Sequence, residues 1–174
     1  MEVVIDKSKR NFLRGRKLPK KVEIRLPWIK SEQAFIDGCT QCGDCISDCA
    51  QNIIIKADDG FPKVDFSIDE CTFCEKCIDS CEQDLFVEAK QHSAWPAHLN
   101  IKDDCLAKQQ IYCQSCKDVC EPRAIAFKFI DNAIPKPVID QDACTSCGAC
   151  ISVCPSNSTE LVLKEAFNGT TSKN

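Results

Sequence analysis

Sixteen cysteines, arranged in four groups of four, constrain this chain of 174 residues more than any other feature. Three groups have the spacing C-x2-C-x2-C-x3-C, and the third group differs only because its first gap is seven residues long. So many thiols in a short chain indicate a fold that is cross-linked or held by metal, with less dependence on a large apolar core. The groups are Cys39, Cys42, Cys45 and Cys49; Cys71, Cys74, Cys77 and Cys81; Cys105, Cys113, Cys116 and Cys120; and Cys144, Cys147, Cys150 and Cys154.

The spacing predicts iron–sulfur clusters. It is the spacing of bacterial ferredoxins, in which three cysteines of one group hold a [4Fe-4S] cluster and the fourth cysteine ligates the other cluster of a pair. Zinc sites use C-x2-C pairs separated by a longer insertion, and disulfides need an oxidising compartment, so both fit less well. At four thiolates per cluster, the sixteen cysteines predict four [4Fe-4S] clusters, and electrons are the expected cargo.

The separations between the groups favour pairing in chain order. Cys45 and Cys77 are 32 residues apart, and Cys116 and Cys150 are 34 apart. A nested pairing, of group one with four and two with three, stays open. Cys105, which the seven-residue gap separates from the rest of its group, is more consistent with a ligand than with a spare thiol. Pairing in chain order predicts four sets: Cys39, Cys42 and Cys45 with Cys81; Cys71, Cys74 and Cys77 with Cys49; Cys105, Cys113 and Cys116 with Cys154; and Cys144, Cys147 and Cys150 with Cys120.

The predicted fold is α+β, made of two tandem bacterial 2[4Fe-4S] ferredoxin-like units after a basic N-terminal arm. Short apolar runs that contain proline, at 61–66 and 134–140, indicate edge strands ahead of groups two and four. Apolar residues after each fourth cysteine indicate return strands, and each group is expected to carry one short helix. The predicted boundaries are an arm over 1–30, a first half over 31–90, a linker over 91–98, a second half over 99–165 and a disordered tail over 166–174.

Charge is distributed unevenly along the chain. Residues 1–30 hold ten basic and three acidic side chains, whereas the rest of the chain holds 12 basic and 23 acidic ones. A basic arm on an acidic body favours docking to partners, although both charge sets could also be ordinary solvated surface.

Other signals narrow the class of protein. No stretch approaches the roughly 20 apolar residues of a membrane-spanning helix. The segment 8–14 resembles a twin-arginine export signal, but no apolar region or cleavage site follows it, so a cytoplasmic location is expected. No G-x-G-x-x-G, P-loop or nucleophile–base pattern is present, so we expect an electron carrier without catalytic residues, and no nucleic-acid partner.

Several motifs together resemble the NapF family, the ferredoxin-type proteins of periplasmic nitrate reductase systems. They are Ser8-Lys9-Arg10, Arg25-Leu26-Pro27-Trp28, Ala94-Trp95 and the unusual third cysteine group with its ending Cys120-Glu121-Pro122. The resemblance implies a cytoplasmic protein with four [4Fe-4S] clusters that binds the precursor of NapA, the catalytic nitrate reductase subunit, or a similar molybdoenzyme. Such a protein would receive electrons from redox proteins and assist maturation before export, by supplying electrons or clusters. A general polyferredoxin carrier and an electron-wire subunit of a larger oxidoreductase are the alternatives.

Overall fold

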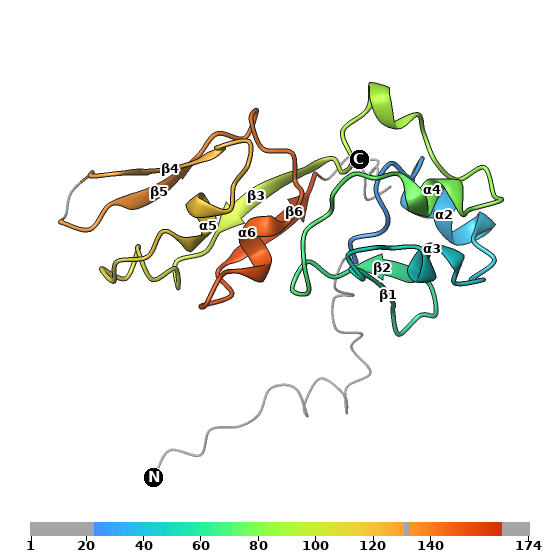
Figure 1. Ribbon diagram of the computed structural model, residues 1–174, viewed down its shortest axis with the longest axis horizontal. Helices are drawn as coiled ribbons and strands as arrows, with labels where there is room; N and C mark the ends of the chain where they lie inside the picture. Colours follow the sequence, from blue (N-terminus) through green and yellow to red (C-terminus); the bar gives the residue numbers. More distant parts are fainter. Residues whose placement is uncertain (1–22, 131–132, 165–174) are drawn as a thin grey trace, which may run out of the picture.

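The computed structural model describes residues 23–130 and 133–164, so most of the predicted arm and all of the predicted tail lie outside the described residues. Two lobes lie side by side, and each follows the chain through one predicted half (Figure 1). The first lobe contains α2 (Glu32–Gly38), α3 (Asp44–Ser47), β1 (Ile54–Lys56), β2 (Pro62–Val64), α4 (Lys76–Asp79) and the 3-10 turn η1 (Ala89–Gln91). The second lobe contains β3 (Ala97–Ile101), α5 (Ser115–Asp118), β4 (Ile125–Lys128), β5 (Lys136–Ile139), α6 (Ala149–Ser152) and β6 (Thr159–Leu163).

The sheets are two-stranded and antiparallel. β1 pairs with β2, β4 pairs with β5, and β3 pairs with β6. In the first lobe the counterpart of the β3–β6 pair is a single bridge between Ile29 and Phe86. The two lobes therefore repeat one plan, which confirms the predicted α+β class with small sheets and short helices.

Each cysteine group contains one helix of a single turn. The fourth cysteine of every group lies two residues beyond the last residue of its helix, where the chain has already turned away. In three groups the residue before the helix has a positive φ, namely Gly43 (φ 92), Glu75 (φ 61) and Gly148 (φ 88). This tight entry lets the first three cysteines surround one space, because the backbone reverses within a few residues.

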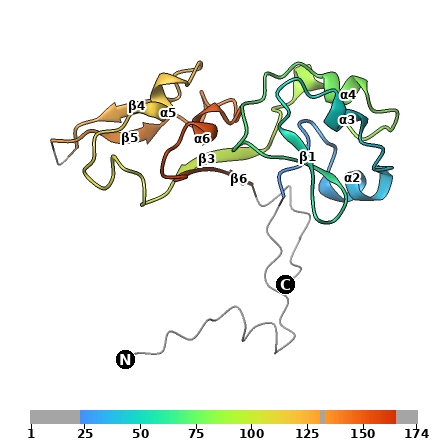
Figure 2. The same ribbon diagram turned by 60° about the horizontal axis from the view of Figure 1, so that its bottom comes forward.

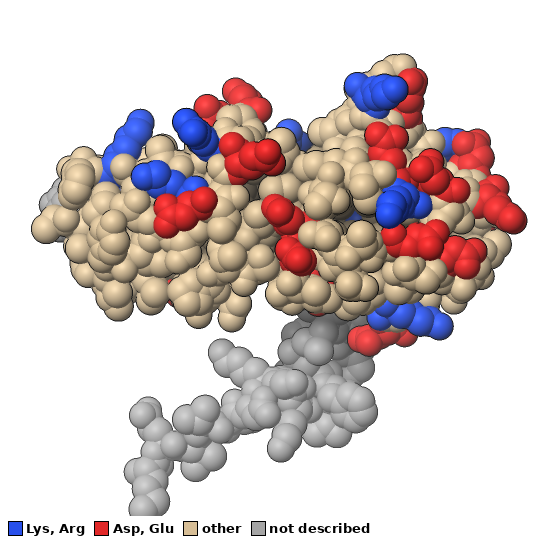
Figure 3. All heavy atoms as spheres, viewed as in Figure 1, with Lys and Arg blue, Asp and Glu red and all other residues tan. Residues whose placement is uncertain are grey.

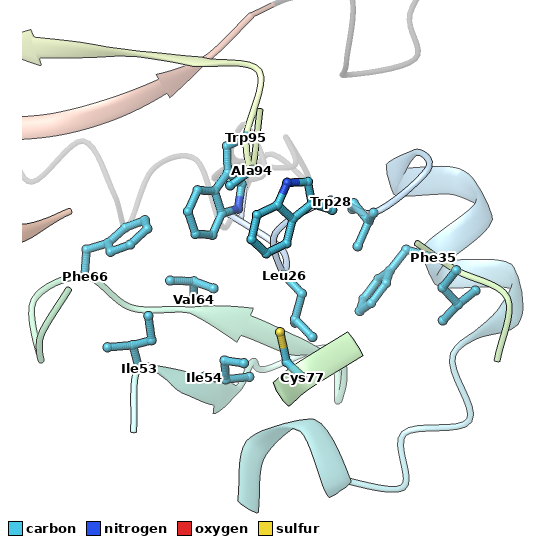
Figure 4. Close-up of a cluster of buried hydrophobic side chains, with 12 residues drawn as sticks. Leu26, Trp28, Phe35, Ile53, Ile54, Val64, Phe66, Cys77, Ala94 and Trp95 are labelled. Carbon is cyan, nitrogen blue, oxygen red and sulfur yellow. The ribbon is translucent and has the colours of Figure 1, made fainter. Parts of the chain in front are cut away.

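The largest core lies in the first lobe (Figure 4). The Phe66 ring packs edge-on against Trp95 at a centroid distance of 5.2 Å. The Trp28 indole N–H donates to the His92 carbonyl, and the Trp95 indole N–H donates to the Arg25 carbonyl, both over 2.9 Å. The arm boundary at residue 30 and the linker over 91–98 stay predictions, but the structure places core residues inside both segments.

The two lobes also contact each other. The backbone N–H of Cys71 donates to the carbonyl of Cys147 over 2.8 Å. Gly148, at the start of α6, lies directly against the Phe66 ring, since a Cβ built on this glycine would approach the ring to 2.0 Å. The side chain of Ile151 also packs against the core of the first lobe. Within the described residues, no helix is both long enough and apolar enough to cross a membrane.

A buried arginine joins three segments of the first lobe. Arg25 is 2% exposed, and its guanidinium forms ion pairs with Glu32 of α2 over 3.0 Å and with Asp59 of the β1–β2 turn over 2.8 Å. Its guanidinium carbon also lies 5.9 Å and 5.8 Å from the ring centroids of Phe35 and Phe61. Such cation–π contacts stabilise the fold most when the cation is removed from water.

Arg25→Met is therefore expected to lower the free energy of unfolding by about 3 kcal/mol, the lower end of the range for a broken buried pair, because the two carboxylates stay partly hydrated. The measurement is the shift in the midpoint of anaerobic thermal unfolding of the cluster-loaded protein. Lys30→Met is the matched control, since it removes an exposed ion pair with Asp84 and should change stability by less than about 0.5 kcal/mol. Equal shifts in the two variants would contradict this role for Arg25.

Candidate metal centres

The sixteen cysteines surround four separate cavities, four cysteines to each. Each cavity takes the first three cysteines of one group and the fourth cysteine of its neighbour, as in the pairing by chain order. We name the cavities by their cysteines: site I has Cys39, Cys42, Cys45 and Cys81; site II has Cys71, Cys74, Cys77 and Cys49; site III has Cys105, Cys113, Cys116 and Cys154; and site IV has Cys144, Cys147, Cys150 and Cys120.

The donor set fits an iron–sulfur cluster at each site. All sixteen cysteines are free thiols, and four of them around one cavity are the ligand set of a [4Fe-4S] cluster. Across residues 23–130 and 133–164, no three His, Cys, Asp or Glu side chains are close enough to share a single metal ion. A zinc site would need four ligands gathered at about 2.3 Å from one ion.

Most of the perturbed thiols have a raised pKa. Burial raises the pKa of Cys45, Cys77 and Cys150 to about 12, and that of Cys71 and Cys116 to about 11. Neighbouring cysteines raise these values further, because thiolates that lie close together repel one another. Loading a cluster must therefore displace protons from these thiols, which makes it dependent on pH.

Cys154 of site III differs from the other thiols. Burial alone would raise its pKa, but hydrogen bonds from Ser158, Ser156 and Thr159 lower the pKa of Cys154 to about 6. The Ser158 hydroxyl lies 3.4 Å from the Cys154 sulfur, the Ser158 backbone N–H donates to that sulfur over 3.3 Å, and the Ser156 hydroxyl lies 3.7 Å away. This sulfur is therefore well suited to carry negative charge.

The two serines are functional candidates that the cysteine pattern alone does not reveal. The signal for Ser158 appears when the residue four positions after each fourth cysteine is compared between the groups. Ile53, Leu85 and Ala124 hold this position in the first three groups, and only the fourth group has a hydroxyl there, on Ser158. The backbone contact itself is shared, because the Ala124 N–H donates to the Cys120 sulfur over 3.2 Å.

Comparison with known families bears on the cofactor content. The family described as "4Fe-4S dicluster domain" matches residues 38–85 and again residues 111–158. Each match covers most of one lobe, so two dicluster domains with sixteen cysteines fit four [4Fe-4S] clusters. This confirms the predicted cofactor content. Such clusters supply one-electron transfer.

Three relatives show how far the similarity extends. The chain is 43% identical to the ferredoxin-type protein NapF of Haemophilus influenzae over 136 aligned residues. The alignment covers 78% of this chain and 77% of the relative. It is 39% identical to NapF of Escherichia coli K12 over 151 aligned residues, and this alignment covers 87% of the chain and 92% of the relative. It is also 35% identical over 144 residues to one component of the ion-translocating oxidoreductase complex of Methanosarcina acetivorans, over 80% of this chain and 52% of the relative. No solved structure matches the chain.

Proposed function

Because the chain belongs to the NapF family of ferredoxin-type proteins, an iron–sulfur electron-transfer family, we propose that it serves the cytoplasmic precursor of NapA, the catalytic nitrate reductase subunit. In this role it binds the precursor before export and assists its maturation by supplying electrons or an Fe–S cluster. The observation that carries the proposal is the similarity to two NapF proteins over more than three quarters of this chain. The chain acts in the cytoplasm, takes electrons from redox proteins and has no substrate site of its own.

The sixteen cysteines are the proposed cluster ligands, in the four sets that line sites I to IV. The cavity linings support this assignment, because each cavity combines three cysteines of one group with the fourth of its neighbour. Cys105 belongs to site III under this assignment, although seven residues separate it from Cys113. It is buried beside Ile101 and Ala107, which keeps its sulfur in the core of the second lobe.

The charge distribution supports docking to a protein partner. Acidic side chains are concentrated over the first lobe on the face shown in Figure 3. The segment 1–22, which lies outside the described residues, contains eight of the ten basic side chains of the predicted arm. Opposite charges on two parts of one chain can steer a partner that carries both signs, and they act mainly on the rate of association.

A binding experiment tests the proposal. The cluster-loaded protein is captured anaerobically with the NapA precursor at low and at high salt, and its association should weaken as salt increases. A variant with glutamine at the eight basic positions of 1–22 should bind at least about tenfold more weakly at low salt if these charges steer docking. A variant with glutamine at Lys128 and Lys136 of the β4–β5 hairpin, far from the arm in sequence, is the control.

Two results would count against the proposal. Absence of association with the precursor at low salt would exclude the maturation role and leave the general polyferredoxin carrier. Co-purification with a membrane oxidoreductase would instead favour the electron-wire function, which the similarity to a component of an ion-translocating oxidoreductase complex makes worth testing.

A further inference from the structure

The four sites are arranged in a row. Site I adjoins site II because Cys45 lies close enough to Cys77 for its charge to raise the pKa of that thiol. Site II adjoins site IV across the lobes, where the Cys71 N–H donates to the Cys147 carbonyl over 2.8 Å. Site IV adjoins site III through Cys150 and Cys116. The helices agree with this order, since α6 of site IV lies nearer to the first lobe than α5 of site III in both views (Figure 1 and Figure 2).

We propose that site III is the most oxidising of the four sites, so that electrons carried by this chain collect at that end of the row and leave from it. The proposal rests on the cluster ligands proposed above, but it does not depend on NapA as the partner. A one-electron donor protein is oxidised at the other end, and a one-electron acceptor protein is reduced at site III. No covalent bond forms or breaks in this transfer.

Hydrogen bonds to sulfur give the first argument. Reduction adds negative charge to a cluster and its thiolates, so donors that point at a ligand sulfur stabilise the reduced form and raise the potential. At site III, the hydroxyls of Ser156 and Ser158 lie against Cys154, and the hydroxyl of Ser115 lies 3.8 Å from the Cys113 sulfur. At site IV, within the described residues, the Ser146 hydroxyl interacts with Cys144 and the Ala124 N–H donates to the Cys120 sulfur.

The burial of Ser158 strengthens this argument. Ser158 is 0% exposed, so water does not compete for its hydroxyl. The Ser156 and Ser158 hydroxyls also lie 2.8 Å from each other, so one of them can donate to the other, and a hydroxyl that accepts such a bond is a stronger donor to the Cys154 sulfur. The backbone at Ser158 is fixed as well, because its carbonyl accepts from the Lys102 N–H over 2.8 Å.

Charge gives a second, independent argument. Residues 23–90 carry 15 acidic and six basic side chains, whereas residues 99–165 carry nine acidic and seven basic ones. Figure 3 shows most acidic side chains of the visible face over the first lobe. Negative surroundings oppose the addition of an electron, so the first lobe should hold the lower potentials. Both arguments therefore give the same direction, from the first lobe towards site III.

The test is an anaerobic potentiometric titration followed by EPR, on the full chain with all clusters loaded. In the double variant Ser156→Ala with Ser158→Ala, the couple of highest potential should move down. At a fixed potential its ratio of reduced to oxidised form should fall about tenfold, which is 59 mV for a one-electron couple. Iron content should not change, because neither serine is a ligand.

A reciprocal variant adds a hydroxyl at another site and serves as the control. Ala124→Ser places a hydroxyl at the matching position after Cys120 and should raise the potential of site IV while the highest couple stays in place. If the double serine variant leaves the highest couple unmoved while Cys154 stays protected from alkylation, the tuning proposal is wrong and the ligand assignment stands. If Cys154 can be alkylated in the loaded wild-type protein, the ligand assignment itself is wrong, and the proposal falls with it.

Discussion

Serine in place of Cys39, Cys42 and Cys45 is expected to remove one of the four clusters and to expose the thiol of Cys81. The reason is the lining of site I, where these three cysteines meet Cys81 and not Cys49. At four irons per cluster, the iron content of the anaerobically loaded protein should fall from about sixteen to about twelve per chain. Alkylation of the native protein, located by mass spectrometry, should then label Cys81 and leave Cys49 protected.

A companion variant gives the matched control. Serine in place of Cys71, Cys74 and Cys77 should expose Cys49, because these four line site II. The nested pairing makes a different prediction for the first variant, since Cys154 of the fourth group would become the exposed thiol. Labelling of Cys154 or Cys49 in that variant would overturn the assignment of site I. Cys42→Ser alone, at an exposed cysteine, repeats the test if the triple variant does not accumulate.

Local features of the fold were predictable from the sequence. The spacing of each cysteine group dictates a tight loop and one helical turn, because a C-x2-C-x2-C segment must reverse within a few residues. The strands around Pro62 and Pro137 were predictable too, since proline is tolerated at a sheet edge and alternating apolar residues flank it. These inferences depend only on neighbours in the chain, and short-range order is what a single sequence encodes most directly.

Contacts between distant segments were not predictable in the same way. Arg25 has the charge of its basic neighbours in the sequence, yet it is buried because Asp59, 34 residues away, reaches its guanidinium. Trp95 stands in a polar stretch, and its burial depends on Phe66 and on the Arg25 carbonyl. The contact between Cys71 and Cys147 joins the lobes through backbone atoms, which carry no signature in residue identity.

Gly148 is the residue where such a long-range contact should have the largest effect on stability. It has φ +88, and a Cβ there would lie 2.0 Å from the Phe66 ring of the other lobe. That ring cannot easily move, because Phe66 is 4% exposed and packs against Trp95 (Figure 4). Gly43 holds the same place in the first cysteine group with φ +92, but a Cβ there would meet nothing within 4 Å. The two glycines thus share backbone strain and differ in packing.

Gly43→Ala should therefore lower the free energy of unfolding by about 1 kcal/mol, the strain of a left-handed alanine. Gly148→Ala should lower it by about 3 kcal/mol, because overpacking adds to the same strain. It should also reduce iron content, since Gly148 lies between Cys147 and Cys150 of site IV. Both effects are measured anaerobically, from the midpoint of thermal unfolding and from iron per chain.

A double variant separates packing from strain. Phe66→Ala opens space for the new methyl group, so Gly148→Ala should destabilise the Phe66→Ala background by at least about 1 kcal/mol less than it destabilises the wild type. The strain at φ +88 is the same in both backgrounds and cancels in this comparison. If Gly43→Ala and Gly148→Ala were equally destabilising, or if the effects of Gly148→Ala and Phe66→Ala were additive, backbone conformation alone would explain the glycine at position 148. The contact between the lobes would then not depend on the absence of a side chain at this position.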